Sequence, residues 1–228
     1  MENMISIIIA AKKEQYLDKT VEDLRNKARG EIEIIVVKDK PMRTAINEGV
    51  ARATGKYILK TDAHCMFDEG FDVKLIAVHQ PNWVQIPRRK RLDAEKWEVI
   101  QTDVPDVDYM LISKGRGYKD NVKNADPVLK EKLIDDVQIG QGSCWFMTKE
   151  YFNHLKLLDD INFGGMGSEA LEICLKCRAD GGRVIVNKTT WYAHWHKEKG
   201  DLTFRRRMDK SLNYLPTFLK QYEKYISV

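Results

Sequence analysis

Three short apolar runs, separated by segments of helical periodicity, open the chain. Met4–Ala10, Ile32–Val37 and Tyr57–Thr61 are each almost continuously apolar, which is typical of strands buried on both faces of a sheet. Between them, Tyr16–Ala28 and Ala45–Ala53 carry apolar residues at the spacing of a helix. Because strands that alternate with helices tend to form parallel sheets, this pattern predicts an α/β fold with a mostly parallel central sheet and helices on both faces.

The second half of the chain continues the pattern less regularly. Gln80–Asp126 contains prolines and a basic cluster, and we expect strands and long loops there. Helices are predicted over Lys149–Leu157 and Glu169–Ala179, and a last strand over Arg183–Val186.

Length and charge fit one large domain with an appended arm. The 228 residues can bury a sizeable core, so we predict a domain over 1–200 and a basic, aromatic helical arm over 201–228 that docks on it. The net charge of +4 fits an anionic small molecule and permits nucleic acid without requiring it. We find neither a signal peptide nor a run of about 18 apolar residues, and therefore expect no membrane association and a cytoplasmic location, the host cytoplasm if the protein is viral.

Asp62 and His64 directly follow the third apolar run. Side chains of an extended backbone alternate between two faces, so these two residues, two apart, share a face. A carboxylate and an imidazole presented together can bind one divalent cation such as manganese. Asp39 and Asp62 both come just past strand ends, at the rim where ligands bind in parallel sheets. The alternative is a capped strand end with a solvated aspartate and a packed histidine.

Several segments resemble one glycosyltransferase family. The chain is similar to GT-A glycosyltransferases of the family-two type, and especially to the polypeptide N-acetylgalactosaminyltransferase-like branch, whose metal motif has the form Asp-x-His. The matching segments, in chain order, are Ser6–Ile9, Glu33–Asp39, Arg43–Ile58, Asp62–Cys65, Gly140–Met147 and Glu169–Ile173. The resemblance implies a GT-A, Rossmann-like fold over 1–200.

The resemblance also implies a chemistry. A metal-dependent enzyme of this kind moves a sugar from a nucleotide-diphosphate sugar, most simply a UDP-sugar, and Mn²⁺ or Mg²⁺ stabilises the leaving diphosphate. Asp62, His64 and His194 correspond to the metal ligands of that branch. His196 is a rival for the third place, since it lies two residues from His194 on an extended segment.

By the same resemblance, five residues are candidates for binding the nucleotide-sugar donor. Asp39 corresponds to the acid that contacts the nucleoside, although an aspartate at a strand end can merely cap a turn. Arg43 would contact phosphate, against the alternative of a solvated surface position. The five candidates are Ala10, Asp39, Arg43, Asn47 and Asp62.

Glu169 and Glu172 are the candidate catalytic residues. They lie three apart at a helix start and so share a face, where one could contact a sugar hydroxyl or accept a proton from the acceptor. Carboxylates also favour helix N-termini through the helix dipole alone. Ala170 stands where inverting relatives have their base aspartate, so either Glu169 takes that role or the sugar's configuration is retained.

Trp145, Arg88 and Arg89 are the candidate acceptor-binding residues. Trp145 could stack on a sugar or base, or it could belong to the core. The basic clusters Arg88–Arg91 and Arg205–Arg207 would suit DNA, for example a hydroxymethylated base in phage-type DNA that is flipped out to reach the donor, or they could form solvated faces. A small hydroxylated molecule is the alternative acceptor.

Two alternatives to a glycosyltransferase remain open at this stage. One is a nucleic-acid-binding protein on a GT-A-like scaffold with little transferase activity. The other is a nucleotidyltransferase, whose usual first loop is rich in glycine, whereas Ala10–Lys13 contains none.

Overall fold

The computed structural model describes residues 3–112, 119–120, 122–196 and 209–226. The predicted basic segment Arg205–Arg207 lies outside these residues. The strands are β1 (Ile5–Ala11), β2 (Ile32–Lys38), β3 (Tyr57–Asp62), β4 (Cys65–Phe67), β5 (Trp83–Asp93), β6 (Glu98–Val99), β7 (Met110–Leu111), β8 (Lys119–Asp120), β9 (Ile134–Asp136), β10 (Cys144–Thr148) and β11 (Arg183–His194). The helices are α1 (Leu17–Lys27), α2 (Met42–Arg52), α3 (Phe71–Ala77), α4 (Pro127–Glu131), α5 (Lys149–His154), α6 (Glu169–Ala179) and α8 (Asp209–Gln221), with 3₁₀ turns η1 (Val122–Ala125) and η2 (Glu223–Tyr225).

Local sequence explains where some of these helices begin. The Thr148 hydroxyl accepts a hydrogen bond from the backbone of Tyr151 at 3.1 Å and so caps α5. Asp126 caps α4 in the same way, and Pro127 occupies its first turn, where no backbone donor is needed.

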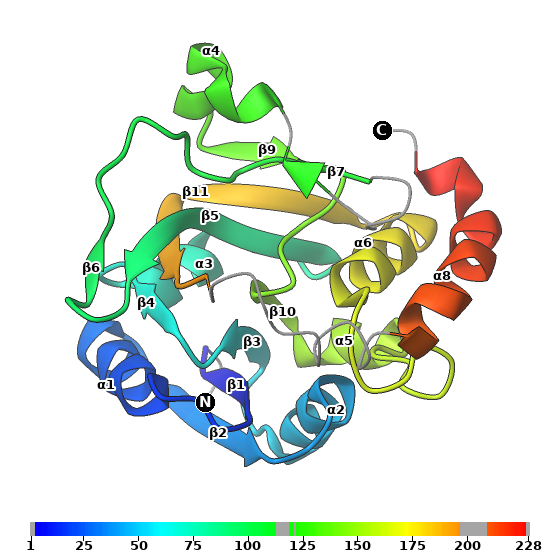
Figure 1. The fold of residues 1–228 in the computed structure, drawn as a ribbon, viewed down its shortest axis with the longest axis horizontal. Helices are drawn as coiled ribbons and strands as arrows, with labels where there is room; N and C mark the ends of the chain where they lie inside the picture. The colour runs from blue at the N-terminus through cyan, green and yellow to red at the C-terminus, as the bar shows by residue number, and fades with distance from the viewer. Residues whose placement is uncertain (1–2, 113–118, 121, 197–208, 227–228) are drawn as a thin grey trace.

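The central sheet has the strand order β2-β1-β3-β10-β5-β11-β4 (Figure 1). β1 pairs in parallel with β2 and β3, and β5 pairs in parallel with β11. β10 runs antiparallel to both β3 and β5, so it joins the two parallel halves, and β4 and β9 pair antiparallel with β11. The prediction of an α/β fold built on a large central sheet is confirmed, with the addition that the sheet is mixed.

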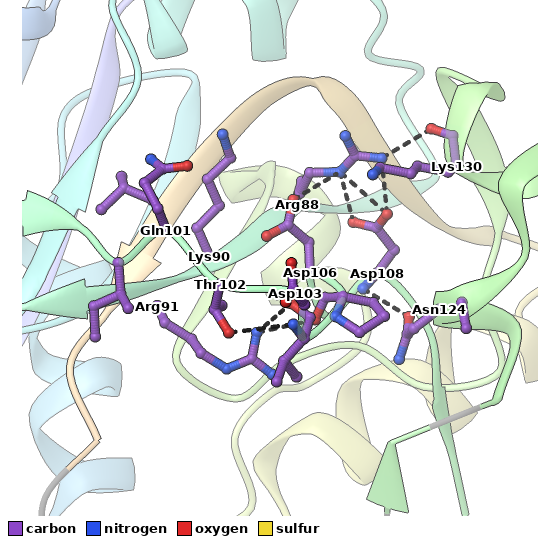
Figure 2. A pocket seen from close by; sticks show the side chains of 15 residues that line it. Arg88, Lys90, Arg91, Gln101, Thr102, Asp103, Asp106, Asp108, Asn124 and Lys130 are labelled. Atoms are coloured by element: carbon purple, nitrogen blue, oxygen red, sulfur yellow. Dashed lines mark hydrogen bonds and ion pairs between the residues drawn. The ribbon is translucent and has the colours of Figure 1, made fainter.

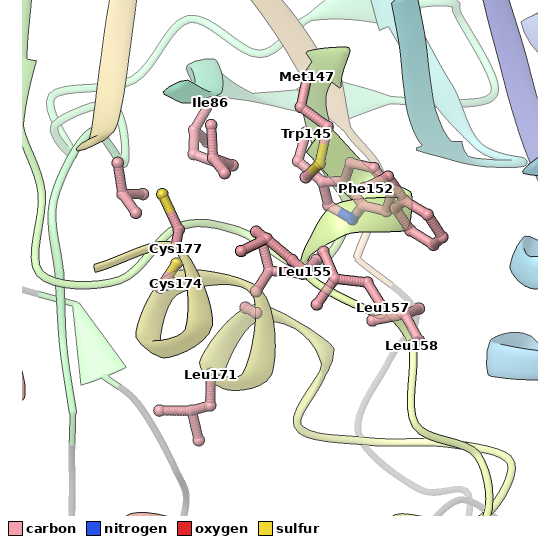
Figure 3. Close-up of a cluster of buried hydrophobic side chains, with 14 of the residues drawn as sticks. Ile86, Trp145, Met147, Phe152, Leu155, Leu157, Leu158, Leu171, Cys174 and Cys177 are labelled. Carbon is pink, nitrogen blue, oxygen red and sulfur yellow. The ribbon is translucent and has the colours of Figure 1, made fainter. Parts of the chain in front are cut away.

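Helices cover both faces of this sheet because the strands are apolar on both sides. In β1, Ile7 and Ile9 pack with α1 and α3, whereas Ile8 between them packs with α2. The core that contains Ile8 also includes α5, α6 and α8 (Figures 1 and 3). Leu215 and Phe218 of α8 are buried in it, so this helix is packed on the main core. No helix in the described residues is long and apolar enough to cross a membrane.

β11 is longer than the sequence pattern predicts. The apolar run ends at Val186, but the strand continues to His194 through an irregularity in its pairing with β5 between Asn187 and Trp191. The polar residues at this point are buried and bonded: Asn187 donates to Gln85 Oε1 at 3.0 Å, and Lys188 Nζ donates to the Tyr109 hydroxyl at 2.9 Å. Since these partners are remote in sequence, apolar periodicity could not reveal the continuation.

His79 makes the stability of this fold depend on pH. Burial lowers its pKa from about 6.5 to about 4, and its ring packs on Tyr57 and Phe146 while Nδ1 bonds Gln85. The unfolded chain therefore binds more protons between these pH values, so this contribution is complete above pH 6.5 and is lost as the pH falls towards 4. We expect the wild type to lose about 1–2 kcal/mol of unfolding free energy from this residue between pH 7 and 5.

The substitution His79→Phe keeps the ring contacts but cannot be protonated. Its unfolding free energy, measured by denaturant titration, should fall less between pH 7 and 5 than that of the wild type. Equal losses in the two proteins would show that His79 is not the group responsible.

Candidate active site

Asp62, His64 and His194 form a candidate metal-binding triad at one edge of the sheet. Asp62 ends β3, His64 follows two residues later, and His194 ends β11 with its backbone paired to Cys65 of β4. One ligand atom from each triad residue lies within 4.8 Å of the others, and His194 Nε2 is 3.2 Å from Asp62 Oδ2. One carboxylate and two imidazoles suit a borderline divalent cation such as Mn²⁺.

Burial and ion pairing set the charges of the triad. Burial would raise the pKa of the Asp62 carboxyl, but the Lys60 ammonium and the hydrogen bond with His194 hold it well below its usual range. Burial lowers the pKa of His194, against the opposing effect of Asp62. His194 Nδ1 is buried and has no hydrogen-bond partner within the described part of the chain. A partly buried carboxylate beside an imidazole with an unsatisfied nitrogen fits a bound cation.

Lys60 is a buried cation beside the triad that the sequence analysis missed. Its side chain is 1% exposed, and its ammonium contacts Asp62 Oδ1 and donates to the Gly142 carbonyl at 2.7 Å. Burial would lower the pKa of Lys60, but the Asp62 carboxylate, and after it the charge of Glu169, raise it. A lysine two residues before Asp62 in an otherwise apolar strand was the available signal, because residues two apart share a face.

Glu14 is a second missed residue. Its Oε2 is 3.2 Å from His64 Nδ1, and it lies in the loop that follows β1. A carboxylate that accepts from one ring nitrogen fixes the tautomer and leaves the other nitrogen available to a metal. No motif marks Glu14, and only the position of its loop on the same rim could have suggested it.

The structure brings His194, and not His196, to Asp62. Among the described residues the potential metal-binding group contains His194 but not His196. The His196 ring lies 4.8 Å from that of His194, measured between centroids, and the residue is exposed. His196 is therefore a neighbour of the triad.

Ala10 and Asp39 lie on the same rim. Ala10 is opposite Asp62 in the parallel pairing of β1 with β3. Asp39 follows β2, is exposed, and donates its backbone N–H to the Ala11 carbonyl at 3.0 Å. Both residues thus border the edge that carries the triad, and their predicted contact with a nucleotide stays a prediction.

Arg43 and Glu172 are placed differently from their predicted roles. Both side chains are 0% exposed and form an ion pair with each other. Arg43 also donates to the Gly167 carbonyl at 2.7 Å, and Glu172 accepts from Lys176 at 2.7 Å. Because their charged groups are buried and satisfied inside the protein, Arg43 is not available to a phosphate, and Glu172 is not available to an acceptor. They join α2 to α6.

Asn47 and Trp145 are also occupied by the protein itself. The Asn47 amide both donates to and accepts from the backbone of Leu158, at 2.8 and 2.9 Å, so it holds this segment in place, and its predicted contact with a nucleotide stays a prediction. Trp145 is 1% exposed and stacks on Phe152 within the core, so it cannot contact an acceptor (Figure 3).

Glu169 remains accessible at the start of α6. Its side chain is half-buried, and Oε1 accepts a hydrogen bond from the Gly167 backbone at 2.9 Å. After burial and Asp62, the charge of Glu169 also contributes to the pKa of Lys60, which lies beside the triad. Of the two predicted catalytic carboxylates, Glu169 is the one that can meet a ligand.

The basic cluster is divided by the alternation of β5. Arg88 forms a bidentate ion pair with Asp108 and donates to the Lys130 carbonyl at 2.9 Å (Figure 2). These residues line a pocket of about 420 Å³ that also includes Asp103 and Asp106. Arg88 is thus neutralised locally, and it does not act together with Arg89.

Arg89 and Arg91 lie nearer the triad. They are in register with Tyr192 and His194 of β11, whereas Arg88 is in register with Trp191. The charges of both arginines lower the pKa of His196, after burial and His194, and Arg89 also lowers that of His194. Arg89 therefore adds positive charge to the triad side of β5, whereas Arg91 also lines the Arg88 pocket, where it donates to the Pro105 carbonyl at 2.9 Å (Figure 2).

The fold and its Asp-x-His motif define the class: this is the GT-A glycosyltransferase fold, as the sequence resemblance predicted. No protein-family model matches the sequence, and no curated protein is significantly similar to it. Among solved structures, the crystal structure of GalNAc-T7 with UDP, GalNAc and Mn²⁺ matches with a TM-score of 0.79 and 16% sequence identity. The match covers 98% of this chain and 49% of that chain, so this chain spans about half the length of that protein.

The buried ion pair gives a test of the structural assignment of Glu172. Glu172→Gln leaves the Arg43 charge buried without its counter-ion, which should lower the unfolding free energy by about 3–5 kcal/mol. The matched control is Glu48→Gln. Glu48 lies on α2, the helix that carries Arg43, and pairs with Lys40 and Arg52 at the surface, so its loss should cost far less. Denaturant unfolding measures both. Similar losses in the two variants would contradict the assignment.

Proposed function

We propose that this protein is a divalent-metal-dependent glycosyltransferase that uses a nucleotide-diphosphate sugar, most simply a UDP-sugar. The observation that carries the proposal is the convergence of Asp62, His64 and His194, which are up to 132 positions apart, at the rim of a GT-A sheet. The structure of GalNAc-T7, which has a similar fold, contains UDP, GalNAc and Mn²⁺, and this supports a UDP-sugar donor and the same ion here.

The chemistry of the triad residues also suits a divalent ion. Mn²⁺, or Mg²⁺, held by the triad would neutralise the charge that develops on the departing diphosphate. The protein holds these ligands in place through its sheet: Asp62 ends β3, and His194 ends β11, which pairs with β4 directly after His64. Glu14 orients the His64 ring. Ala10 and Asp39 border the same rim and are the proposed contacts of the nucleoside.

Glu169 is the proposed residue at the sugar or acceptor. It is the half-buried carboxylate at the start of α6, and its charge reaches Lys60 beside the triad. In this position it would accept a hydrogen bond from a sugar hydroxyl, or the proton of the attacking acceptor. Ala170 offers no alternative base next to it.

The proposed acceptor is a hydroxylated molecule, and a hydroxymethylated base in DNA is the more specific form of this proposal. Its support is Arg89 and Arg91, whose charges reach the histidines at the end of β11. A DNA acceptor would bind more weakly as salt rises, because phosphate contacts release counterions. A small hydroxylated acceptor would show a much weaker dependence on salt.

Removal of a triad ligand tests the proposed enzyme. With a donor chosen by thermal shift from a panel of UDP-, GDP- and dTDP-sugars, His194→Ala should lower the Mn²⁺-dependent release of nucleoside diphosphate by at least about 100-fold, since even residues behind the ligands contribute 10–100-fold. His154→Ala is the control, because His154 is exposed and bonds Asp180 away from the triad. If His194→Ala retains wild-type release, or if EDTA leaves the wild-type rate unchanged, the proposal is wrong.

Glu14 provides a second test that needs no substrate. Glu14→Gln weakens the acceptor that orients His64, so Mn²⁺ affinity in the presence of UDP should fall by about 10-fold. Glu31→Gln, an exposed carboxylate at the start of β2, should leave it unchanged. Isothermal titration with Mn²⁺ measures the affinity of both variants. If Glu14→Gln binds Mn²⁺ as tightly as the wild type, Glu14 does not contribute to the site.

A further inference from the structure

Lys60 places a fixed positive charge next to a site that is suited to a cation. Its ammonium contacts one carboxylate oxygen of Asp62, while His194 Nε2 lies 3.2 Å from the other. A cation held by the triad would therefore share Asp62 with the ammonium. Because like charges repel, such an ammonium opposes the binding of a second positive charge.

The charges around Lys60 do not cancel this effect. Lys60 and Asp62 together have a formal charge of zero, so the buried carboxylate is already balanced. Glu14 and Glu169 add negative charge beside His64 and Lys60, and Arg89 and Arg91 add positive charge beside His194 and His196. A divalent cation that bound alone would leave its charge largely uncompensated, in a region where the triad and Lys60 are mostly buried.

We propose that Lys60 keeps the affinity of the triad for a divalent cation low until a diphosphate is bound, so that metal and nucleotide bind together. The inference rests on the proposed function and concerns the regulation of that site. A diphosphate group supplies the negative charge that the ammonium and the cation both require. Metal and nucleotide are then coupled, and by linkage each raises the affinity for the other by the same factor.

Lys60 could instead serve only to hold the local structure, through Asp62 and the Gly142 carbonyl. The two roles predict opposite changes in the affinity for metal alone when Lys60 is replaced. If Lys60 only positions Asp62, its removal disorders a ligand and weakens metal binding. If it acts as a competing charge, its removal strengthens the binding of metal alone. In either case the Asp62 N–H still donates to the Ser143 carbonyl and holds the backbone, and His194 still contacts the carboxylate.

The experiment measures Mn²⁺ binding by isothermal titration, with MnCl₂ alone and with MnCl₂ in saturating UDP. We expect Lys60→Met to bind Mn²⁺ alone on the order of 10-fold more tightly than the wild type, because a buried like charge has been removed. The factor by which UDP improves Mn²⁺ binding should shrink correspondingly. Lys60→Arg keeps the charge and should retain weak binding of Mn²⁺ alone together with strong coupling to UDP.

Two further variants guard against a folding defect. Lys60→Gln removes the charge but keeps a donor for the Gly142 carbonyl. It replaces Lys60→Met if that variant does not fold, and we expect it to show the same gain in Mn²⁺ affinity. Lys188→Met removes another buried lysine, bonded to Tyr109 and Leu129 away from the triad, and should leave both Mn²⁺ affinities unchanged.

The outcomes separate this inference from the proposed function. If the wild type binds Mn²⁺ neither alone nor with UDP, the proposed function fails and this inference fails with it. If the wild type binds Mn²⁺ with UDP, but the uncharged Lys60 variants bind Mn²⁺ alone with equal or lower affinity, the inference is overturned and the proposed function stands.

Discussion

The pairing of β11 with β4 is the constraint on which the candidate site depends. His194 faces Cys65 across these antiparallel strands, and the Trp195 backbone donates to the His64 carbonyl at 3.2 Å. These backbone contacts bring the end of the last strand to the Asp-x-His turn. The geometry of the candidate metal site is therefore set by sheet hydrogen bonds, and the side chains complete it.

The buried Arg43–Glu172 ion pair positions a second part of the site, the start of α6. It ties α2, which precedes the metal motif, to α6, whose first residue is Glu169. A fully buried pair of this kind costs desolvation and contributes little net stability, but loss of one partner is severe. Its function here is to fix the position of α6 relative to the sheet, and with it the accessible carboxylate at the helix start.

Much of the architecture could be predicted from the sequence because the strands are apolar on both faces. Alternation of these runs with helical periodicity was sufficient for β1, β2, β3 and the helices between them, and the Asp-x-His motif pointed to the fold that comparison with solved structures confirms. β11 was predicted too short, because its continuation past Val186 depends on polar residues whose partners are distant in sequence.

Side-chain roles at the site were harder to predict, since residue type does not report burial. Arg43, Asn47 and Trp145 have chemistries that bind phosphates, nucleotides and sugars, yet Arg43 and Asn47 are bonded inside the protein and Trp145 is buried in the core. Lys60 and Glu14 have no motif, and their proximity to the triad arises only from the tertiary structure. The roles of the basic cluster were also not predictable from residue type, because Arg88 and Arg89 alternate along β5 and have different partners.

The extension of β11 from the core to the triad has a consequence for motion. The strand that ends in His194 begins among Val184 and Val186, which are buried in the main core, and it is paired with β5 on one side along most of its length. A segment of this kind exchanges its amide hydrogens only through openings that approach complete unfolding. The backbone that carries the His194 imidazole is therefore as rigid as the sheet. The site is pre-organised whether or not it holds an ion.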